Sequence, residues 1–304
     1  MTMREGIQDV SCITKCSQYM VFFPMPSKTG LRNVRKIMLC SDRNTTLKER
    51  LDTLYHIYNN KKYVQYDPLR YLYFFEDDVE KELMGLVASS FAFGRVTQIF
   101  KAIDSLLRIM GNSPLKYVMA LGSAPDPALL SFRYRFVSGL DVYRFLRITR
   151  QLIEDYGSIG CFMKRNYNKG DFLRLVDLTM RQYADVRFLV PVSLKTSACK
   201  RLFMYFRWMV REDNIDTGLW NFIDPAELVI PLDTHIFQSA IRLGLTSKKP
   251  PSFAVAREIT EKLKGFCRND PVRYDWAISH EGIIKNNFAT HMAMSERSAC
   301  PVSC

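Results

Sequence analysis

The chain has 304 residues, of which 47% are hydrophobic and 12% aromatic, and this composition excludes a disordered polymer. The length allows one large domain or two lobes. The 43 Lys and Arg residues outnumber the 31 Asp and Glu residues, which gives a formal net charge of +12. Such an excess favours a polyanionic partner, nucleic acid first and an anionic membrane surface second. No run of 18 apolar residues occurs, so no membrane-spanning segment is expected.

The eight cysteines are scattered along the chain, at positions 12, 16, 40, 161, 199, 267, 300 and 304. We recognise no secretory signal ahead of them and therefore expect reduced thiols in a cytoplasmic protein. The close pairs are Cys12 with Cys16 and Cys300 with Cys304. Neither pair has a nearby His or a second pair that would complete a zinc site, so no metal is expected.

The first 46 residues show no clear periodicity and carry seven Lys and Arg against three Asp and Glu. They are interpreted as a basic N-terminal extension, and an ordered arm, a disordered tail and a transit peptide all stay open. The body of the chain, residues 47–284, has the periodicity of amphipathic helices. Residues 285–304 are polar and predict an irregular tail.

Helix starts are marked by local signals. The segment Thr46-Leu47-Lys48-Glu49 fits a capping box, and Asp67-Pro68 is typical of another helix start. Residues 80–110 predict one helix or two. Further helices are predicted at 141–156, 171–188, 197–211 and 252–266, from Asp233 and from Asp270. Strand signals are scarce, so the predicted fold class is all-α, with about ten helices.

The helix predicted at 197–211 is unusually basic for one so apolar. Lys200, Met204, Arg207 and Arg211 fall on one stripe, and Thr196 or Ser197 is expected to cap the start. Lys200 lies in the first turn, where the helix dipole disfavours an ammonium and helps to free the amine. A neutral amine is a nucleophile that can form a Schiff base. The alternative is that the basic residues are a solvated face or contact phosphates.

Asp233 opens the next apolar helix, 33 positions after Lys200. A lysine and a carboxylate at the starts of two successive helices could act together chemically. The alternative is that Asp233 is a plain N-cap that accepts the backbone N–H of His235 or Ile236. His235 is itself more often a packed or capping residue than a catalytic one.

The segment Leu232-Asp233-Thr234-His235-Ile236, followed by Arg242-Leu243, resembles the helix-hairpin-helix DNA glycosylases of the endonuclease III superfamily. A closer resemblance, over residues 47–284, is to a bacterial family of unknown function within that superfamily. It is carried by residues 199–211 and 91–96, by Tyr66-Asp67-Pro68-Leu69, by Asp216-x-Gly218-Leu219-Trp220, by Ile230-Pro231-Leu232-Asp233-Thr234-His235 and by Asp270-Pro271-Val272-x-Tyr274-Asp275.

The resemblance implies a two-lobed helix-hairpin-helix glycosylase-like fold with a cleft between the lobes. It also implies a DNA repair glycosylase that removes a damaged base, with Asp233 as the catalytic carboxylate. Lys200 matches the Schiff-base nucleophile of the members that also act as AP lyases. The alternatives are a non-catalytic helix-hairpin-helix nucleic-acid-binding protein and a helical scaffold for a protein partner.

Double-stranded DNA is the partner that the resemblance implies, for a monomer in the cytoplasm that would be nucleoid-associated in a bacterium. The superfamily's four-cysteine iron–sulfur loop has no counterpart in the cysteine spacing, so no cofactor is expected. The loop at 190–197 also lacks the glycines of the superfamily hairpin. Phosphate contacts are expected from Lys195, Thr196, Ser197, Arg201, Arg207, Arg211 and Arg95, and a base pocket or wedge from Phe93, Trp208 and His235, with Trp220 and Trp276 as further stacking candidates.

Overall fold

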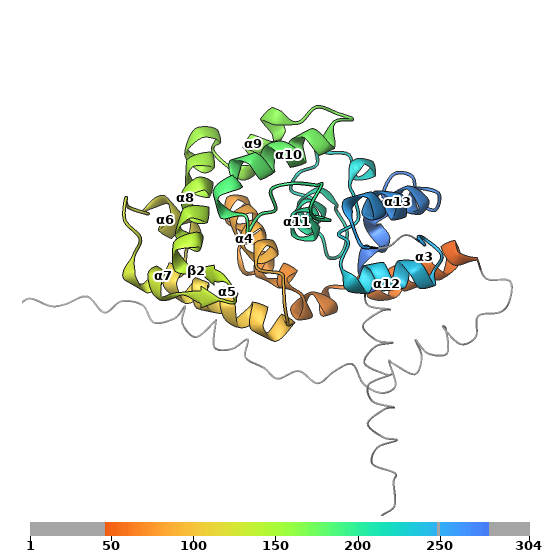
Figure 1. Cartoon of the computed structure of the whole chain (residues 1–304), viewed down its shortest axis with the longest axis horizontal. Coiled ribbons are helices and arrows are strands. Elements are labelled where there is room, and N and C mark those ends of the chain that lie inside the picture. Colours follow the sequence, from red (N-terminus) through yellow and green to blue (C-terminus); the bar gives the residue numbers. More distant parts are fainter. Residues whose placement is uncertain (1–45, 248–249, 280–304) are drawn as a thin grey trace, which may run out of the picture. The chain divides into compact units, whose positions relative to one another are not determined.

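The computed structural model describes residues 46–247 and 250–279 (Figure 1). The chain divides into two units, residues 1–46 and 47–304. The predictions made for residues 1–45, for the tail from 285 and for both close cysteine pairs lie outside the described residues. Within the described ranges, no helix is long and apolar enough to cross a membrane.

The described body is almost entirely helical, which confirms the all-α prediction. The α-helices are α3 (Leu47–Tyr58), α4 (Asp78–Ser90), α5 (Val96–Met110), α6 (Pro114–Met119), α7 (Pro127–Ser131), α8 (Gly139–Tyr156), α9 (Ile159–Asn166), α10 (Phe172–Gln182), α11 (Lys200–Val210), α12 (Thr234–Arg242) and α13 (Phe253–Lys264). The 3₁₀ helices are η2 (Lys61–Tyr66), η3 (Pro68–Phe74), η4 (Ala184–Val186), η5 (Pro225–Glu227) and η6 (Pro271–Tyr274).

Local capping signals explain where several helices begin. Asp67, Asp77 and Ser252 each accept a backbone N–H of the first turn that follows, in η3, α4 and α13. Ser138 and Asp141 form a reciprocal capping box on α8. These side chains satisfy N–H groups that have no partner within the helix.

Several predictions at the level of elements were incomplete. Residues 80–110 form two helices, since Gly94 has a φ of 95° and breaks the run between α4 and α5. The strands β1 (Arg133–Tyr134) and β2 (Val137–Ser138) pair as a short antiparallel hairpin, where no strand was expected. Helix α10 ends at Gln182 instead of continuing to 188.

Helices α4 and α11 pack against each other and form the centre of the described body. Every residue from Glu82 to Ser90 in α4 and from Leu202 to Val210 in α11 is buried. Figure 1 shows α5, α6, α7 and α8 on one side of this pair and α3, α12 and α13 on the other. Helix α4 also contacts η3, α6 and α9, whereas α3 and α13 both contact η6.

Glu82 is a buried carboxylate at the junction of α4 and α9. It accepts the backbone N–H of Gly160 at 2.8 Å and the indole N–H of Trp220 at 2.9 Å. Burial raises its pKa. A Cβ at position 160 would lie 2.1 Å from Glu82 Oε1, so only glycine lets α9 approach this closely.

Helix α3, the first described helix, lies against the last described segment. The hydroxyl of Tyr274 donates to Asp52 Oδ1 at 2.7 Å, although the two residues are 222 positions apart. Figure 1 shows α3 beside the C-terminal elements of this unit. The two ends of the described chain thus close on each other.

Candidate active site

Lys200 and Asp233 form an ion pair, with 3.1 Å between Lys200 Nζ and Asp233 Oδ2. Lys200 is the first residue of α11, and Asp233 is the N-cap of α12. The lysine side chain is 33% exposed and the aspartate side chain 20% exposed. The structure therefore brings together the two residues that the sequence singled out, at a place that a ligand can reach.

The two oxygens of Asp233 have different partners. Oδ1 accepts the backbone N–H of Ile236 at 2.8 Å, as an N-cap does, and Oδ2 faces Lys200. The capping interpretation is therefore correct and coexists with the pairing. His235 lies exposed in the first turn of the same helix.

The residue before Lys200 has an unusual backbone. Cys199, the N-cap of α11, has a φ of 51°, which is left-handed and rare for a residue other than glycine. It makes no side-chain cap, and neither does Thr196 or Ser197, so the predicted cap was wrong. The N–H of Cys199 donates to Ser197 Oγ at 3.0 Å instead. Burial raises the pKa of the Cys199 thiol to about 11, so this thiol does not compete with an amine as nucleophile.

A small pocket opens at the start of α11, with a volume of about 170 Å³. Lys200, Phe93, Ser197 and Arg201 contribute to its wall. Pockets for drug-sized ligands are larger, about 300–1,000 Å³. The cavity beside the ion pair therefore suits a small group.

Arg201 lines this pocket and contacts the segments around it. Its Nη1 donates to the backbone carbonyls of Ser90 at 2.6 Å and Phe188 at 2.7 Å, and its guanidinium lies 4.9 Å from the Phe93 ring centroid. Burial lowers its pKa to about 10, which still leaves it charged at neutral pH. Arg201 was predicted to contact phosphate, but these contacts make it a support for Phe93.

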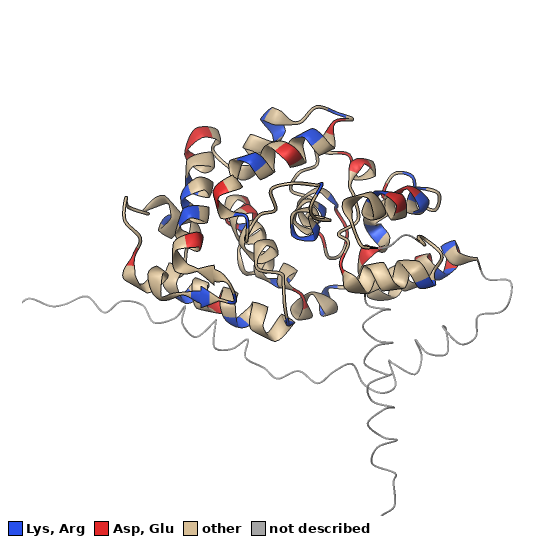
Figure 2. Ribbon diagram, viewed as in Figure 1, with Lys and Arg blue, Asp and Glu red and all other residues tan. Residues whose placement is uncertain are grey.

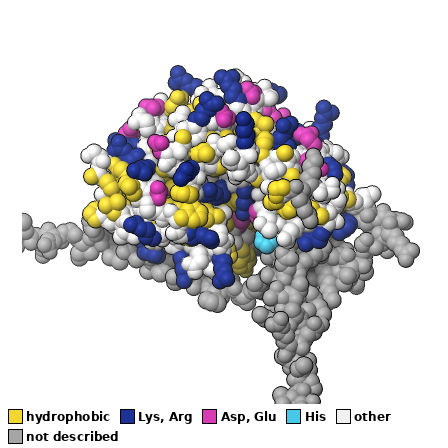
Figure 3. Space-filling model, in the orientation of Figure 1, with side chains coloured by type: hydrophobic (Ala, Val, Ile, Leu, Met, Phe, Trp, Pro, Cys, Tyr) yellow, Lys and Arg dark blue, Asp and Glu magenta, His cyan; other side chains and the backbone are white. Residues whose placement is uncertain are grey.

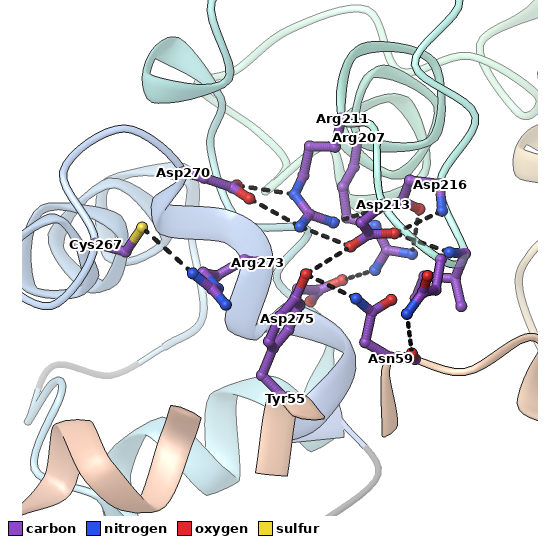
Figure 4. Close-up of polar contacts among 12 residues, drawn as sticks. Tyr55, Asn59, Arg207, Arg211, Asp213, Asp216, Cys267, Asp270, Arg273 and Asp275 are labelled. Atoms are coloured by element: carbon purple, nitrogen blue, oxygen red, sulfur yellow. Dashed lines mark hydrogen bonds and ion pairs between the residues drawn. The ribbon is translucent and has the colours of Figure 1, made fainter. Parts of the chain in front are cut away.

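Arg207 and Arg211 do not face solvent, which corrects their prediction as phosphate contacts. They are 4% and 3% exposed and lie within a group of buried aspartates (Figure 4). Asp216 accepts from both arginines, and Asp275 pairs with Arg207. Desolvating two guanidinium groups is costly unless carboxylates neutralise them, which explains why these aspartates surround α11 here.

Arg211 adds two further partners to this cluster. It donates from Nε and Nη2 to the two oxygens of Asp270, both at 2.8 Å, and from Nη2 to Asp213 at 2.9 Å. Tyr55 of α3 also donates to Asp213 at 3.3 Å. We call Arg207, Arg211, Asp213, Asp216, Asp270 and Asp275 the buried charge cluster. It fastens α11 to α3 and to the C-terminal segment.

The buried charge cluster reaches the ion pair through Asp275. Burial raises the pKa of Asp275, the Arg207 guanidinium opposes this rise, and Asp233 and Lys200 are close enough to contribute as well. Burial likewise raises the pKa of Asp216 to about 6 in spite of its two arginines. Asp275, the member of the buried charge cluster that interacts with Lys200 and Asp233, is therefore held in the core by its pairing with Arg207.

The tryptophans are not available for stacking on a base. Trp208 is 0% exposed, Trp220 1% and Trp276 5%, and each is part of the core. This overturns the placement of Trp208 in a base pocket. By contrast, Arg95 and the loop residues Lys195, Thr196 and Ser197 are exposed, and their contact with DNA stays a prediction.

Basic residues are not confined to α11. Figure 2 shows Lys and Arg along α8 and α10 as well, with acidic residues between them. Within the described ranges, no group of three or more His, Cys, Asp or Glu residues is arranged to hold a metal ion.

Two sets of residues near this site were not predicted from the sequence. The aspartates of the buried charge cluster follow α11 or flank η6, and three of them stood in the motifs that carried the resemblance. The hairpin with Arg135 and Phe136 gave no usable signal, because its strands have two residues each and its turn has no glycine or asparagine.

Residues 67–284 match the profile of a family described as "Protein of unknown function (DUF2400)". No curated protein and no solved structure gives a significant match. The matched segment covers more than two thirds of the 304 residues and includes Lys200, Asp233 and the buried charge cluster. The chain therefore belongs to this family of proteins of unknown function.

Proposed function

We propose that this protein is a DNA glycosylase with a two-lobed helix-hairpin-helix glycosylase-like fold and a cleft between the lobes. The observation that carries the proposal is the 3.1 Å contact between Lys200 Nζ and Asp233 Oδ2, in which Lys200 also lines a small pocket. A glycosylase must extrude its target nucleotide from the duplex, and a small cavity beside the nucleophile fits that requirement.

Asp233 would stabilise the positive charge that develops on the sugar as the glycosidic bond breaks. Its Oδ1 stays engaged with Ile236, so the carboxylate is held in place before the substrate arrives. A preorganised carboxylate needs no reorientation during the reaction. This accounts for a catalytic residue that is also a helix cap.

Lys200 would be the nucleophile. Its Nζ first passes a proton to Asp233 Oδ2, and Asp233 gives this proton to the base as the bond from C1′ to the base breaks, so the carboxylate is charged again when positive charge develops on the sugar. The bonding electrons leave with the base, and the neutral Nζ forms a bond to C1′. Transfer of a second Nζ proton to the ring oxygen O4′ then opens the sugar ring and gives a protonated C1′=Nζ imine, the Schiff base from which an AP lyase breaks the strand.

Double-stranded DNA is the proposed partner, and the exposed residues Arg95, Lys195, Thr196 and Ser197 are its proposed phosphate contacts. The backbone N–H of Lys195 is already donated to Ser193 Oγ at 3.1 Å. The loop would therefore contact phosphate through side chains, which fits its lack of glycine. The monomeric state and the cytoplasmic location stay predictions.

The test is borohydride trapping on duplexes that carry an abasic site or an oxidised guanine. The wild type should give a covalent adduct, because borohydride reduces the imine to a stable amine, and Lys200→Gln should give none. Lys164→Gln, which removes an exposed lysine of α9, should trap as well as the wild type. Asp233→Asn keeps an N-cap residue but removes the negative charge. If this variant folds normally and no longer releases the base, the charge of Asp233 is required for catalysis.

No adduct with any duplex, together with base release that needs Asp233, would leave a glycosylase without a lysine nucleophile. The absence of both a covalent adduct and base release across a panel of lesions would refute the proposed enzymatic activity. Salt-dependent binding alone would then identify a non-catalytic nucleic-acid-binding protein.

A further inference from the structure

A short hairpin places an aromatic ring on the surface next to the pocket. Strand β1 pairs with β2, so Arg135 and Phe136 form a two-residue turn. Arg135 has a φ of 53°, a conformation that is uncommon outside glycine, asparagine and aspartate. Phe136, which follows it, is 55% exposed. The turn thus combines a strained backbone with an exposed phenylalanine.

Phe136 lies between two other phenylalanine rings, stacked on Phe93 and tilted against Phe188. Its ring lies 5.2 Å from that of Phe93 at an interplanar angle of 13°, and 5.0 Å from that of Phe188. Phe188 is 43% exposed. We call Phe93, Phe136 and Phe188 the aromatic surface. Because Phe93 also lines the pocket beside Lys200, the aromatic surface continues from the pocket wall.

Contacts beneath the aromatic surface hold its residues in position. The hydroxyl of Tyr134 donates to the backbone carbonyl of Phe93. Gly94 has a φ of 95°, a conformation that favours glycine, and a Cβ there would lie 3.2 Å from the Tyr134 hydroxyl, so the hairpin lies close to the connection between α4 and α5 at this residue. Arg201 supports the Phe93 ring at 4.9 Å. These contacts thus fix the Phe93 ring and the hairpin that carries Phe136.

Exposed arginines occur on the segments that carry these rings. Arg95, Arg133, Arg135 and Arg187 are all exposed, and the Arg187 guanidinium lies 5.3 Å from the Phe188 ring centroid. On the face drawn in Figure 3, hydrophobic side chains lie among Lys and Arg side chains. Exposed aromatic rings among cations are the combination that binds unpaired nucleotides, since the rings stack on bases and the cations neutralise phosphates.

We propose that the aromatic surface binds the unpaired bases of single-stranded DNA, with Phe136 as the principal stacking residue. The proposal rests on the proposed function in that the partner is DNA, and it adds that strands with unpaired bases bind better than perfect duplex. Base–aromatic stacking accepts any base, so the aromatic surface selects for unpaired strand and not for sequence. A nucleotide bound to the aromatic surface lies next to the pocket, because Phe93 belongs to both.

The test is fluorescence anisotropy with a labelled oligothymidine and with a duplex of equal length at one fixed salt concentration. Phe136→Ala should weaken single-strand binding by roughly tenfold, as loss of one stacked base does, and should change duplex binding by less than about twofold. Phe136→Tyr keeps the ring and should restore single-strand binding. Tyr66→Ala removes an exposed aromatic of η2, 42% exposed, and is the matched control.

Unchanged single-strand affinity in Phe136→Ala would overturn the proposal, and so would an equal loss for duplex. Sedimentation of the same variants tests a second copy of the chain as the occupant. Self-association that Phe136→Ala abolishes, with DNA binding unaffected, would assign the aromatic surface to a dimer and refute the proposal. Single-strand binding that needs Phe136, without any borohydride adduct or base release, would support the role of the aromatic surface and refute the glycosylase function.

Discussion

Lys200 and Arg207 of α11 and its C-cap Arg211 follow one helical stripe and yet meet two different surroundings. Helical periodicity predicted that they share a face, which the structure agrees with. It did not predict what this face meets, because the aspartates come from the segment after α11 and from residues 270 and 275. Local spacing fixes which side chains point together, whereas long-range packing decides whether they meet water or carboxylates.

Replacing Arg207 with Met should destabilise the protein without acting on DNA contacts directly. The change leaves Asp275 without its guanidinium partner and removes one of the two from Asp216, and breaking a buried pair costs about 3–5 kcal/mol. Lys195→Gln, at an exposed position, should change the free energy of unfolding by less than about 0.5 kcal/mol. It should instead lower the slope of log affinity against log salt by about 1.

Urea denaturation and DNA titration at several salt concentrations measure both effects. An Arg207→Met protein that keeps its stability but has a smaller salt slope would show that Arg207 contacts phosphate after all.

Asp216 predicts a specific pH dependence. Its pKa is raised to about 6 by burial, whereas an aspartate in an unfolded chain has a pKa of about 3.9. The folded state therefore holds the proton more tightly, and the stabilisation from this proton is present below about pH 4 and is lost as pH rises to about 6. The difference in unfolding free energy between wild type and Asp216→Asn should fall by at most about 3 kcal/mol over this window.

Urea denaturation at pH 4, 5, 6 and 7 measures this difference. A difference that grows with pH would mean that the two arginines outweigh burial and hold the pKa of Asp216 below its ordinary value.

At the level of elements, helix starts were predicted better than any other feature. Asp67 and Ser252 cap η3 and α13 through a side chain two or three residues from its partner N–H, so the signal is local. The hairpin was missed because its strands are too short for an alternating pattern, and α9 because eight residues give barely two turns. The contact between Lys200 and Asp233 was expected from the resemblance, since nothing in their spacing requires it.

Gly160→Ala should destabilise the protein although alanine is the better helix former. Propensity alone would give a gain of about 1 kcal/mol. The new methyl group would instead lie 2.1 Å from Glu82 Oε1 and 2.6 Å from Trp220 Nε1, which would push α9 away from α4. We expect a net loss of about 2–4 kcal/mol, because buried hydrogen bonds to a carboxylate would be broken.

Thermal denaturation of Gly160→Ala beside Cys161→Ala tests this. Cys161 is the exposed neighbour on α9, and its replacement should be nearly neutral. A Gly160→Ala protein as stable as the control would show that α9 can shift at no cost.

For the whole molecule, the hydrogen bond between Tyr274 and Asp52 joins the two ends of the described chain. Tyr274→Phe removes the 2.7 Å hydrogen bond to Asp52 and should lower the free energy of unfolding by about 1–2 kcal/mol, because a bond to a carboxylate is lost at a partly exposed site. Tyr66→Phe, at an exposed tyrosine, should have no measurable effect. Urea denaturation of both variants measures this, and equal midpoints would show that the contact contributes nothing.

The junction between Asp52 and Tyr274 also has a consequence for synthesis on the ribosome. Asp52 is made early, and its partner follows 222 residues later. At about 5–20 residues per second, roughly 10–45 s pass between the two. During this time α3 has no C-terminal segment to pack against, and Arg207 and Arg211 are made before Asp270 and Asp275. The body of the protein can therefore complete its folding only when nearly the whole chain has left the ribosome.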